Sequence, residues 1–170
     1  EQLMPYLRVN KRGVRFTAEY EAYNHLANAI QAQPGAYNYY IVDANVMDIV
    51  TSIWTPSSSC YGPKEVWAGA ATSDTLEELA EKMGVPADAF VATINHWNEM
   101  CDAGEDTDFH FPGKMMHKID TAPFYATKEM ASALCTCGGL QITDKSEVLN
   151  AEAQPIAGLY AIGNVSGSMF

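Results

Sequence analysis

The sequence predicts an α+β fold in which helices cover a small mixed or antiparallel sheet. Residues 75–83 and 86–103 repeat apolar side chains at helical spacing. Short runs of β-branched and aromatic residues, such as YNYYIVD at 37–43, are typical of strands. Apolar residues make up 48% and charged residues 18% of the chain, which are ordinary values for a globular protein. With 170 residues, the chain is long enough to bury its own core.

The first predicted elements are a hairpin and a helix. Two strand-like runs, at 7–10 and 14–17, flank a Lys-Arg-Gly turn in which Gly13 supplies the positive φ that such turns need. Thr17 has a hydroxyl group suited to cap a helix N-terminus. The helix that follows is expected to end at about Gln33, before a Pro-Gly pair.

Two helices with start and stop signals occupy the middle of the sequence. The loop-like composition at 55–63 separates them from the preceding strand. TLEE at 75–78 is a capping box, and Gly84 lies where a glycine commonly follows a helix. Pro86 favours the first turn of the next helix, which should end near Gly104. One stripe of this second helix carries Phe90, Ile94, Trp97 and Cys101.

Irregular segments and short strands make up the rest of the chain. The segment after the second helix is polar, and its DTD run at 106–108 is predicted to be a solvated turn. A paired-glycine turn at 138–139 leads into an expected strand at 140–142. A second expected strand at 159–162 runs directly into Gly163.

Charge and cysteine usage exclude several classes of function. The formal net charge of −11 at pH 7 argues against binding to nucleic acid or an anionic membrane surface, because both require a basic patch. No apolar run approaches the roughly 18 residues of a membrane-spanning helix. The four cysteines form no CxxC pair, so reduced thiols and no metal site are expected. Cys135 and Cys137 lie two residues apart, which leaves a cysteine-based redox or metal protein as an alternative.

Six sequence motifs give the chain a family resemblance. Its closing segment combines TCGGLQI at 136–142 with PIAGLYAIGN at 155–164. This segment resembles the end of the FAD-dependent flavoproteins of the fumarate reductase and succinate dehydrogenase type, whose relatives include urocanate reductase and ketosteroid dehydrogenase. The resemblance extends through the body of the chain in the family's order, with VNKRGVRFTAE, TLEELAEKMGV, NEMCDAGEDTDF and IDTAPFYA at 9–19, 75–85, 98–109 and 119–126.

The resemblance implies a domain organisation. It assigns 1–122 to a capping, or substrate-lid, domain and 123–170 to the C-terminal strands of an incomplete FAD-binding domain. The GxGxxG fingerprint of such domains occurs nowhere in the sequence. We therefore expect the chain to be part of a longer enzyme, with the missing FAD-binding domain as its partner. FAD is expected in that parent enzyme, whereas the chain alone is expected to bind no cofactor and to be inactive.

The resemblance also implies a reaction and a proton donor. Family members transfer a hydride from flavin N5 to one carbon of an activated C=C bond, and a side chain protonates the other carbon. In fumarate-reducing members the donor is an arginine seven residues after the phenylalanine that matches Phe16, and Tyr23 holds that position here. A tyrosine phenol is protonated at neutral pH and can donate to a developing enolate. Packing of Tyr23 on the apolar side of its helix is the alternative interpretation.

A second departure from the family pattern concerns the substrate. Carboxylate-reducing members have two histidines where this chain has Leu134 and Cys135, which favours a larger, less charged unsaturated substrate of the acrylate or enone type. A non-catalytic binding module that retains only the capping fold is a further alternative. The resemblance assigns substrate binding to Cys135, Thr136 and Gly138, and cofactor binding to Gly139, Gly163, Asn164 and Ser166.

Overall fold

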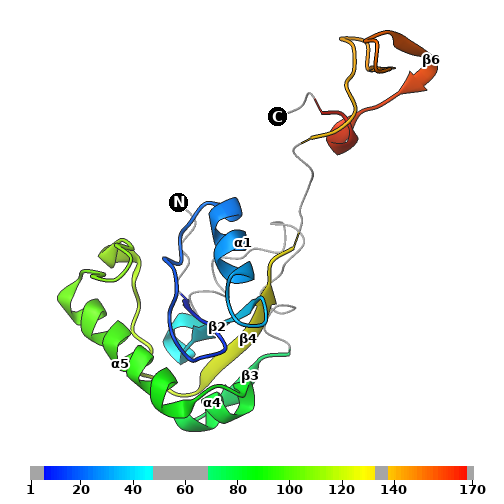
Figure 1. Ribbon diagram of the computed structural model, residues 1–170. Helices are drawn as coiled ribbons and strands as arrows, with labels where there is room; N and C mark the ends of the chain where they lie inside the picture. The colour runs from blue at the N-terminus through cyan, green and yellow to red at the C-terminus, as the bar shows by residue number, and fades with distance from the viewer. Residues whose placement is uncertain (1–5, 48–68, 133–137, 168–170) are drawn as a thin grey trace. The chain divides into compact units, whose positions relative to one another are not determined.

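The computed structural model describes residues 6–47, 69–132 and 138–167, which divide between two compact units (Figure 1). Unit 1 comprises Glu1–Ala131 and unit 2 comprises Ser132–Phe170. Unit 1 combines helices with a four-stranded antiparallel sheet, and unit 2 contains a two-stranded antiparallel sheet. The predicted α+β class is therefore confirmed. The loop predicted at 55–63 lies outside the described residues.

The sheet of unit 1 has the strand order β1-β2-β4-β3. Its register sets Leu7 opposite Ile41, and Ile41 opposite Ala126. These three side chains are buried on the same face of the sheet, where they join the main hydrophobic core. The strand predicted at 37–43 is confirmed as β2. The four strands are β1 (Leu7–Val9), β2 (Tyr37–Val42), β3 (Ala71–Ser73) and β4 (Phe124–Met130).

The predicted hairpin forms its turn but not its second strand. Gly13 has a φ of +75°, as expected, and a Cβ there would lie 2.9 Å from the backbone nitrogen of Phe90. After the turn, pairing is limited to one antiparallel bridge between Val9 and Arg15, and β1 pairs along its length with β2 instead. The second run stops pairing because the Arg15 side chain enters a buried ion network next to the sheet.

Helix α1 (Tyr23–Gln31) begins five residues later than the sequence indicates. The prediction that Thr17 caps it is wrong, because the N-cap is Ala22, which makes no side-chain capping bond. The intervening residues do not form a helix since Glu19 is drawn into the interior, where its carboxylate binds Arg15 and the backbone N–H of Arg8. These tertiary contacts outweigh the weak helical preference of a short polar segment.

Helix α4 (Leu76–Met83) has the boundaries that its capping signals predict. The Thr75 hydroxyl accepts a hydrogen bond of 3.3 Å from the backbone N–H of Glu78, and Gly84 ends the helix with a φ of +68°. Only half of the capping box forms. The Glu78 carboxylate accepts instead from the Ser73 hydroxyl at 3.1 Å, which links the helix to edge strand β3.

Helix α5 (Ala87–Ala103) follows directly and ends at Gly104, whose φ is +71°. Pro86 is its N-cap rather than its first helical residue. Figure 1 shows α4 and α5, in green, along one side of the sheet. The inward stripe of α5 consists of Phe90, Ile94, Trp97 and Met100, all buried, while the predicted stripe member Cys101 is only partly buried.

The segment after α5 contradicts the prediction of a solvated turn. The Asp106 side chain is buried, because its carboxylate accepts hydrogen bonds from three backbone N–H groups and from Arg15. A short 3-10 helix, η1 (Gly113–Met115), follows. The chain is then tied to α5 by two side chains. The Trp97 indole donates to the carbonyl of His117 at 2.7 Å, and the Asn98 amide bonds both backbone groups of Ile119.

Unit 2 is built from β5 (Glu147–Leu149), β6 (Pro155–Tyr160) and the 3-10 helix η2 (Gly163–Val165). The strand expected at 140–142 is reduced to single bridges at Leu140 and Ile142. The strand expected at 159–162 starts earlier, at Pro155, and stops at Tyr160 because the chain turns into η2, where Gly163 has a φ of +72°.

The division between the units falls later than the domain boundary expected at 122/123. Strand β4 pairs with both β2 and β3, so the residues up to Ala131 belong to unit 1. The expected boundary precedes β4, because the residues of a strand do not by themselves show which sheet the strand joins.

Candidate functional site

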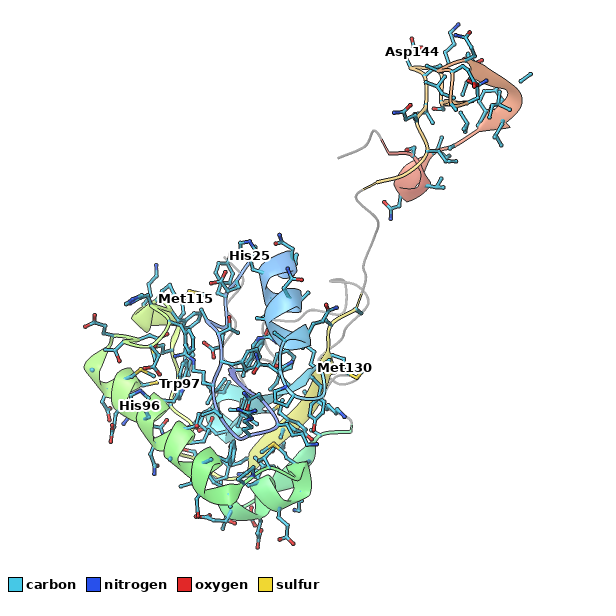
Figure 2. All side chains as sticks on the ribbon, in the orientation of Figure 1. His25, His96, Trp97, Met115, Met130 and Asp144 are labelled. Carbon is cyan, nitrogen blue, oxygen red and sulfur yellow. The ribbon has the colours of Figure 1, made fainter. Side chains whose placement is uncertain are left out.

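Tyr23 is the first residue of α1, and its side chain is 77% exposed. Among the described residues, the ring therefore does not pack on the apolar side of its helix. The neighbouring ionisable groups are also on the surface. His25, marked in Figure 2, has its Nδ1 3.8 Å from a carboxylate oxygen of Glu21, an i,i+4 pair that straddles the start of the helix. The structure thus presents a phenol at an accessible helix end, and its role as acid stays a prediction.

A buried ion network lies just before this helix. Arg15 donates from Nη2 to Glu19 at 2.7 Å and from Nη1 and Nη2 to the two carboxylate oxygens of Asp106, also at 2.7 Å. Its Nε makes a further bond of 3.0 Å to Glu19. The guanidinium carbon lies 4.8 Å from the ring centre of Trp97 and 4.9 Å from that of Phe109. The sequence shows all of these residues, but only the fold brings them together.

The pKa values of the two carboxylates of the network are shifted in opposite directions. Burial raises the pKa of Glu19, which receives hydrogen bonds from Arg15 and one long backbone contact of 3.4 Å. Burial also opposes ionisation of Asp106, but hydrogen bonds from Arg15 and from backbone N–H groups hold its pKa well below the usual range. Asp106 is therefore the firmly charged partner of Arg15.

A second polar cluster, which was not predicted from the sequence, lies on the sheet face opposite α4 and α5. Arg8 is 2% exposed and donates to Asn38 at 3.2 Å, to the Tyr40 hydroxyl at 2.7 Å and to Glu129. Its guanidinium also lies 4.3 Å from the Tyr40 ring centre. The signal that was available is the alternation along β2, whose residues 38 and 40 share a face. The hydrogen bonds between these side chains join strands β1, β2 and β4.

Among the described residues, a hollow of about 100 Å³ lies between the hairpin and α5. Its lining includes Arg15, Asp108, and the His96 and Trp97 side chains labelled in Figure 2. His96 Nε2 lies 3.1 Å from both carboxylate oxygens of Asp108. The hollow is smaller than the roughly 150 Å³ cavity that accommodates benzene in an engineered protein. It is therefore too small for a flavin or for a substrate built on a substituted ring.

In unit 2, the predicted cofactor residues lie around a close backbone contact. A Cβ on Gly139 would overlap the Val165 carbonyl group and would lie 2.8 Å from the backbone nitrogen of Gly167. Leu140 continues this contact, since its N–H donates to the carbonyl of Val165 and its carbonyl accepts from the N–H of Gly167, both at 2.9 Å. Glycine at 139 thus allows the two segments to meet.

The remaining predicted cofactor residues lie in or beside η2. Among the described residues, none has an atom within 4 Å of the position that a Cβ of Gly163 would take. Asn164 is exposed. Ser166 is buried, and its hydroxyl donates to the carbonyl of Gly163 at 2.8 Å, so it holds the turn together. The segment GNVSG at 163–167 carries no carboxylate that would repel an anionic group.

The predicted substrate residues are only partly within the described chain. Cys135 and Thr136 lie outside it, whereas Gly138 is exposed with open space around its Cα. In the parts of the chain that the structure describes, no group of three or more His, Cys, Asp or Glu side chains is arranged to hold a metal ion. None of the helices described there has the length and apolar character needed to cross a membrane.

Comparison with known proteins identifies the family. The model of the FAD binding domain family matches residues 6–170. The NADH:acrylate oxidoreductase of Vibrio harveyi is 37% identical over 165 residues, which cover 96% of this chain and 16% of that protein. The vinyl phenol reductase of Lactiplantibacillus plantarum is 33% identical over 177 residues, which cover 94% of this chain and 36% of that protein.

A solved structure shows the same fold. The open conformation of a flavocytochrome c3 fumarate reductase superposes with a TM-score of 0.77 at 28% identity, over 96% of this chain and 27% of that one. This chain therefore belongs to the FAD binding domain family, among its fumarate reductase-like flavoproteins, as the motifs indicated. It spans between about a sixth and about a third of the length of the two curated relatives.

Proposed function

We propose that this chain is the substrate-capping part, with C-terminal strands of the FAD-binding domain, of a longer FAD-dependent oxidoreductase that reduces an activated C=C bond. Relatives named for the reduction of acrylate and of a vinyl phenol support this type of bond. The structural observation that carries the proposal is the 77% exposure of the Tyr23 side chain at the first residue of α1. A large aromatic side chain exposed at the family's acid position is available to a substrate.

In this proposal Tyr23 donates its phenolic proton to the α-carbon of the substrate. Donation leaves a phenolate at the start of α1, where unpaired backbone N–H groups carry partial positive charge. That end of the helix is suited to the negative charge that develops, because Ala22 supplies no side-chain acceptor for these N–H groups. Tyr23 would then recover its proton from solvent, to which it is exposed.

The residues of unit 2 supply binding surface rather than chemistry. FAD, when bound in the complete enzyme, supplies the hydride for the other carbon of the double bond. The Gly163 backbone and the amide of Asn164 would lie against the cofactor, while Ser166 keeps the η2 turn in shape. Gly139 supports the same surface by allowing residues 165–167 to approach closely.

The substrate in this proposal is an acrylate or an enone on a larger apolar frame. Leu134 and Cys135 replace the histidine pair that would bind a small dicarboxylate, and Thr136 with Gly138 completes the contact surface. A ring-bearing substrate gains from apolar contact at these positions, whereas a dianion would lose its hydration without compensation.

The test is Tyr23→Phe in the complete FAD enzyme, with Tyr20→Phe as the matched control. Tyr20 is also exposed, at 55%, but does not hold the position seven residues after Phe16 at which the family's acid lies. We expect Tyr23→Phe to lower kcat for C=C reduction by ~10²–10⁴-fold, the usual loss for a general acid, without slowing flavin reduction by an artificial donor. Near-parental turnover in Tyr23→Phe would rule the acid role out.

A further inference from the structure

Helix α1 is held only weakly by its own packing. Of its nine residues only Ile30, near the C-terminal end, is buried. Its N-terminal half, which carries Tyr23, is on the surface, and Ala22 offers no capping side chain. The place where this helix begins must therefore be set by the segment that leads into it.

That segment is anchored at Glu19, four residues before Tyr23. The Glu19 side chain has no exposed surface, and its carboxylate accepts from Arg15 Nε at 3.0 Å, from Arg15 Nη2 at 2.7 Å and from the backbone N–H of Arg8 at 3.4 Å. Ala18 beside it is buried in the main core. In contrast, the adjoining Tyr20 and Glu21 are exposed.

Arg15 is itself immobilised from the other side. Asp106 binds both terminal nitrogens, and its own carboxylate is fixed by the backbone N–H groups of 108, 109 and 111. The rings of Trp97 and Phe109 confine the guanidinium. A bidentate arginine pair holds both distance and orientation, so the position of α5 and its following loop is transmitted to Glu19.

We infer that Glu19, Arg15 and Asp106 are positioning residues that set where α1 begins and so where the Tyr23 phenol lies. The inference rests on the proposed function of Tyr23. The network joins two segments that have no regular secondary structure, the approach to α1 and the loop after α5, whereas the sheet and α4–α5 pack through apolar contacts. Because a displacement of about 1 Å can cost two orders of magnitude in rate, fixing the approach to α1 has a direct catalytic consequence.

The first experiment measures hydrogen exchange in the 170-residue chain. Glu19→Gln removes the charge with little change in shape. The matched control is Glu129→Gln, since Glu129 is the carboxylate partner of the other buried arginine, Arg8, but lies on β4. In Glu19→Gln we expect the hydrogen-bonded amides of α1, residues 26–31, to exchange at least about 10-fold faster, with those of α4 and α5 unchanged. In Glu129→Gln residues 26–31 should keep parental exchange. Parental exchange there in Glu19→Gln overturns the inference.

The second experiment is a double-mutant cycle in the complete FAD enzyme. Glu19→Gln should lower kcat about 10-fold or more and leave KM unchanged. In the Tyr23→Phe background the same substitution should cost nothing further, because Glu19 acts through Tyr23. Additive losses, or an unchanged kcat in Glu19→Gln alone, overturn the positioning role while Tyr23 remains the acid. If Tyr23→Phe by itself retains the parental rate, the proposed function fails instead.

A milder variant keeps the inference testable if Glu19→Gln unfolds the whole unit. Phe109→Leu removes one of the rings that confine Arg15 and leaves every charge in place, at a side chain that is 38% exposed. In this variant too we expect faster exchange at residues 26–31 and a lower kcat, and both changes should be smaller than in Glu19→Gln. If Glu19→Gln unfolds the whole unit and Phe109→Leu changes neither quantity, the network only stabilises the fold and the inference is wrong.

Discussion

Arg15 and Asp106, 91 residues apart in the sequence, form a bidentate pair with both nitrogen–oxygen distances at 2.7 Å. Each belongs to a different sequence motif of the flavoprotein family, RFTAE and GEDTDF. Their contact shows that the two motifs act as one structural unit. Arg15 also binds Glu19, so one buried cation serves two carboxylates and joins the approach to α1 to the loop after α5.

The stability of unit 1 should depend on pH through Asp106. Folding lowers the pKa of this group, so the fold favours its ionised form. The stabilisation is present above the ordinary aspartate pKa of about 3.9 and is lost as the pH falls toward the folded value. Asp106→Asn should cost about 3–5 kcal/mol at pH 7, because it leaves Arg15 incompletely paired. In urea unfolding the difference from the parent should be smaller at about pH 3 than at about pH 5, and it should shrink further as the pH falls toward the lowered pKa of folded Asp106. An equal difference at both pH values would contradict the assignment.

Gly13 should tolerate a side chain less well than another glycine of similar backbone conformation. Gly84→Ala introduces only the strain of a positive φ, about 1–2 kcal/mol, because a Cβ there meets no atom within 4 Å. Gly13→Ala carries the same strain and also places a Cβ 2.9 Å from the backbone of Phe90, which should add about 1–3 kcal/mol. Thermal unfolding of the two variants measures the difference. Equal losses would show that the hairpin turn moves freely away from α5.

The paired glycines of unit 2 should respond differently to the same substitution. In Gly139→Ala the new methyl group would lie 2.7 Å from the carbonyl carbon of Val165 and 2.8 Å from the nitrogen of Gly167. We expect this variant to lose the bridge between Leu140 and Ser166, and Gly138→Ala to keep it, because position 138 has open space. Amide chemical shifts of residues 140 and 165–167 give the measurement. An undisturbed spectrum for Gly139→Ala would contradict the observed close approach.

Unit 2 should exchange its amide hydrogens faster than α4. All six residues of β6 are exposed, including Ile156, Leu159 and Tyr160, and a two-stranded sheet is only marginally stable by itself. In α4, by contrast, Leu79, Ala80 and Met83 are buried in the core. Native-state hydrogen exchange of the 170-residue chain compares the two directly. Equal protection of β5, β6 and α4 would show that unit 2 is stabilised independently.

The chain by itself should bind FAD poorly. Its described residues offer exposed backbone at η2 but no helix that begins in a glycine-rich turn after a strand, which is the usual site for a pyrophosphate. We expect no saturable change in flavin fluorescence below about high-micromolar FAD, a range typical of a site that lacks its main anion-binding element. A sub-micromolar dissociation constant would show that these residues suffice for cofactor binding.

The sequence by itself determined the features that depend on neighbouring residues. The start of α4 at Thr75, its end at Gly84 and the end of α5 at Gly104 all appear as predicted, because capping bonds and positive φ angles involve residues only a few positions apart. The strand at 37–43 and the family assignment were predicted for a similar reason, since each rests on a continuous pattern of residues. The position of Tyr23, seven residues after Phe16, likewise follows from the local sequence, and its role as proton donor is a prediction.

Only the tertiary structure decided where long-range partners meet. Thr17 has the side chain of a helix cap, yet α1 begins at Tyr23 because Glu19 is bound by Arg15 in the interior. Asp106 has the composition of a solvated turn, yet it is buried because a guanidinium from 91 residues away neutralises it. Buried charges must be paired, and the free energy of pairing exceeds the small local preferences of these segments. Such partners are chosen by the folded sheet and helices, so a local pattern of residues does not contain them.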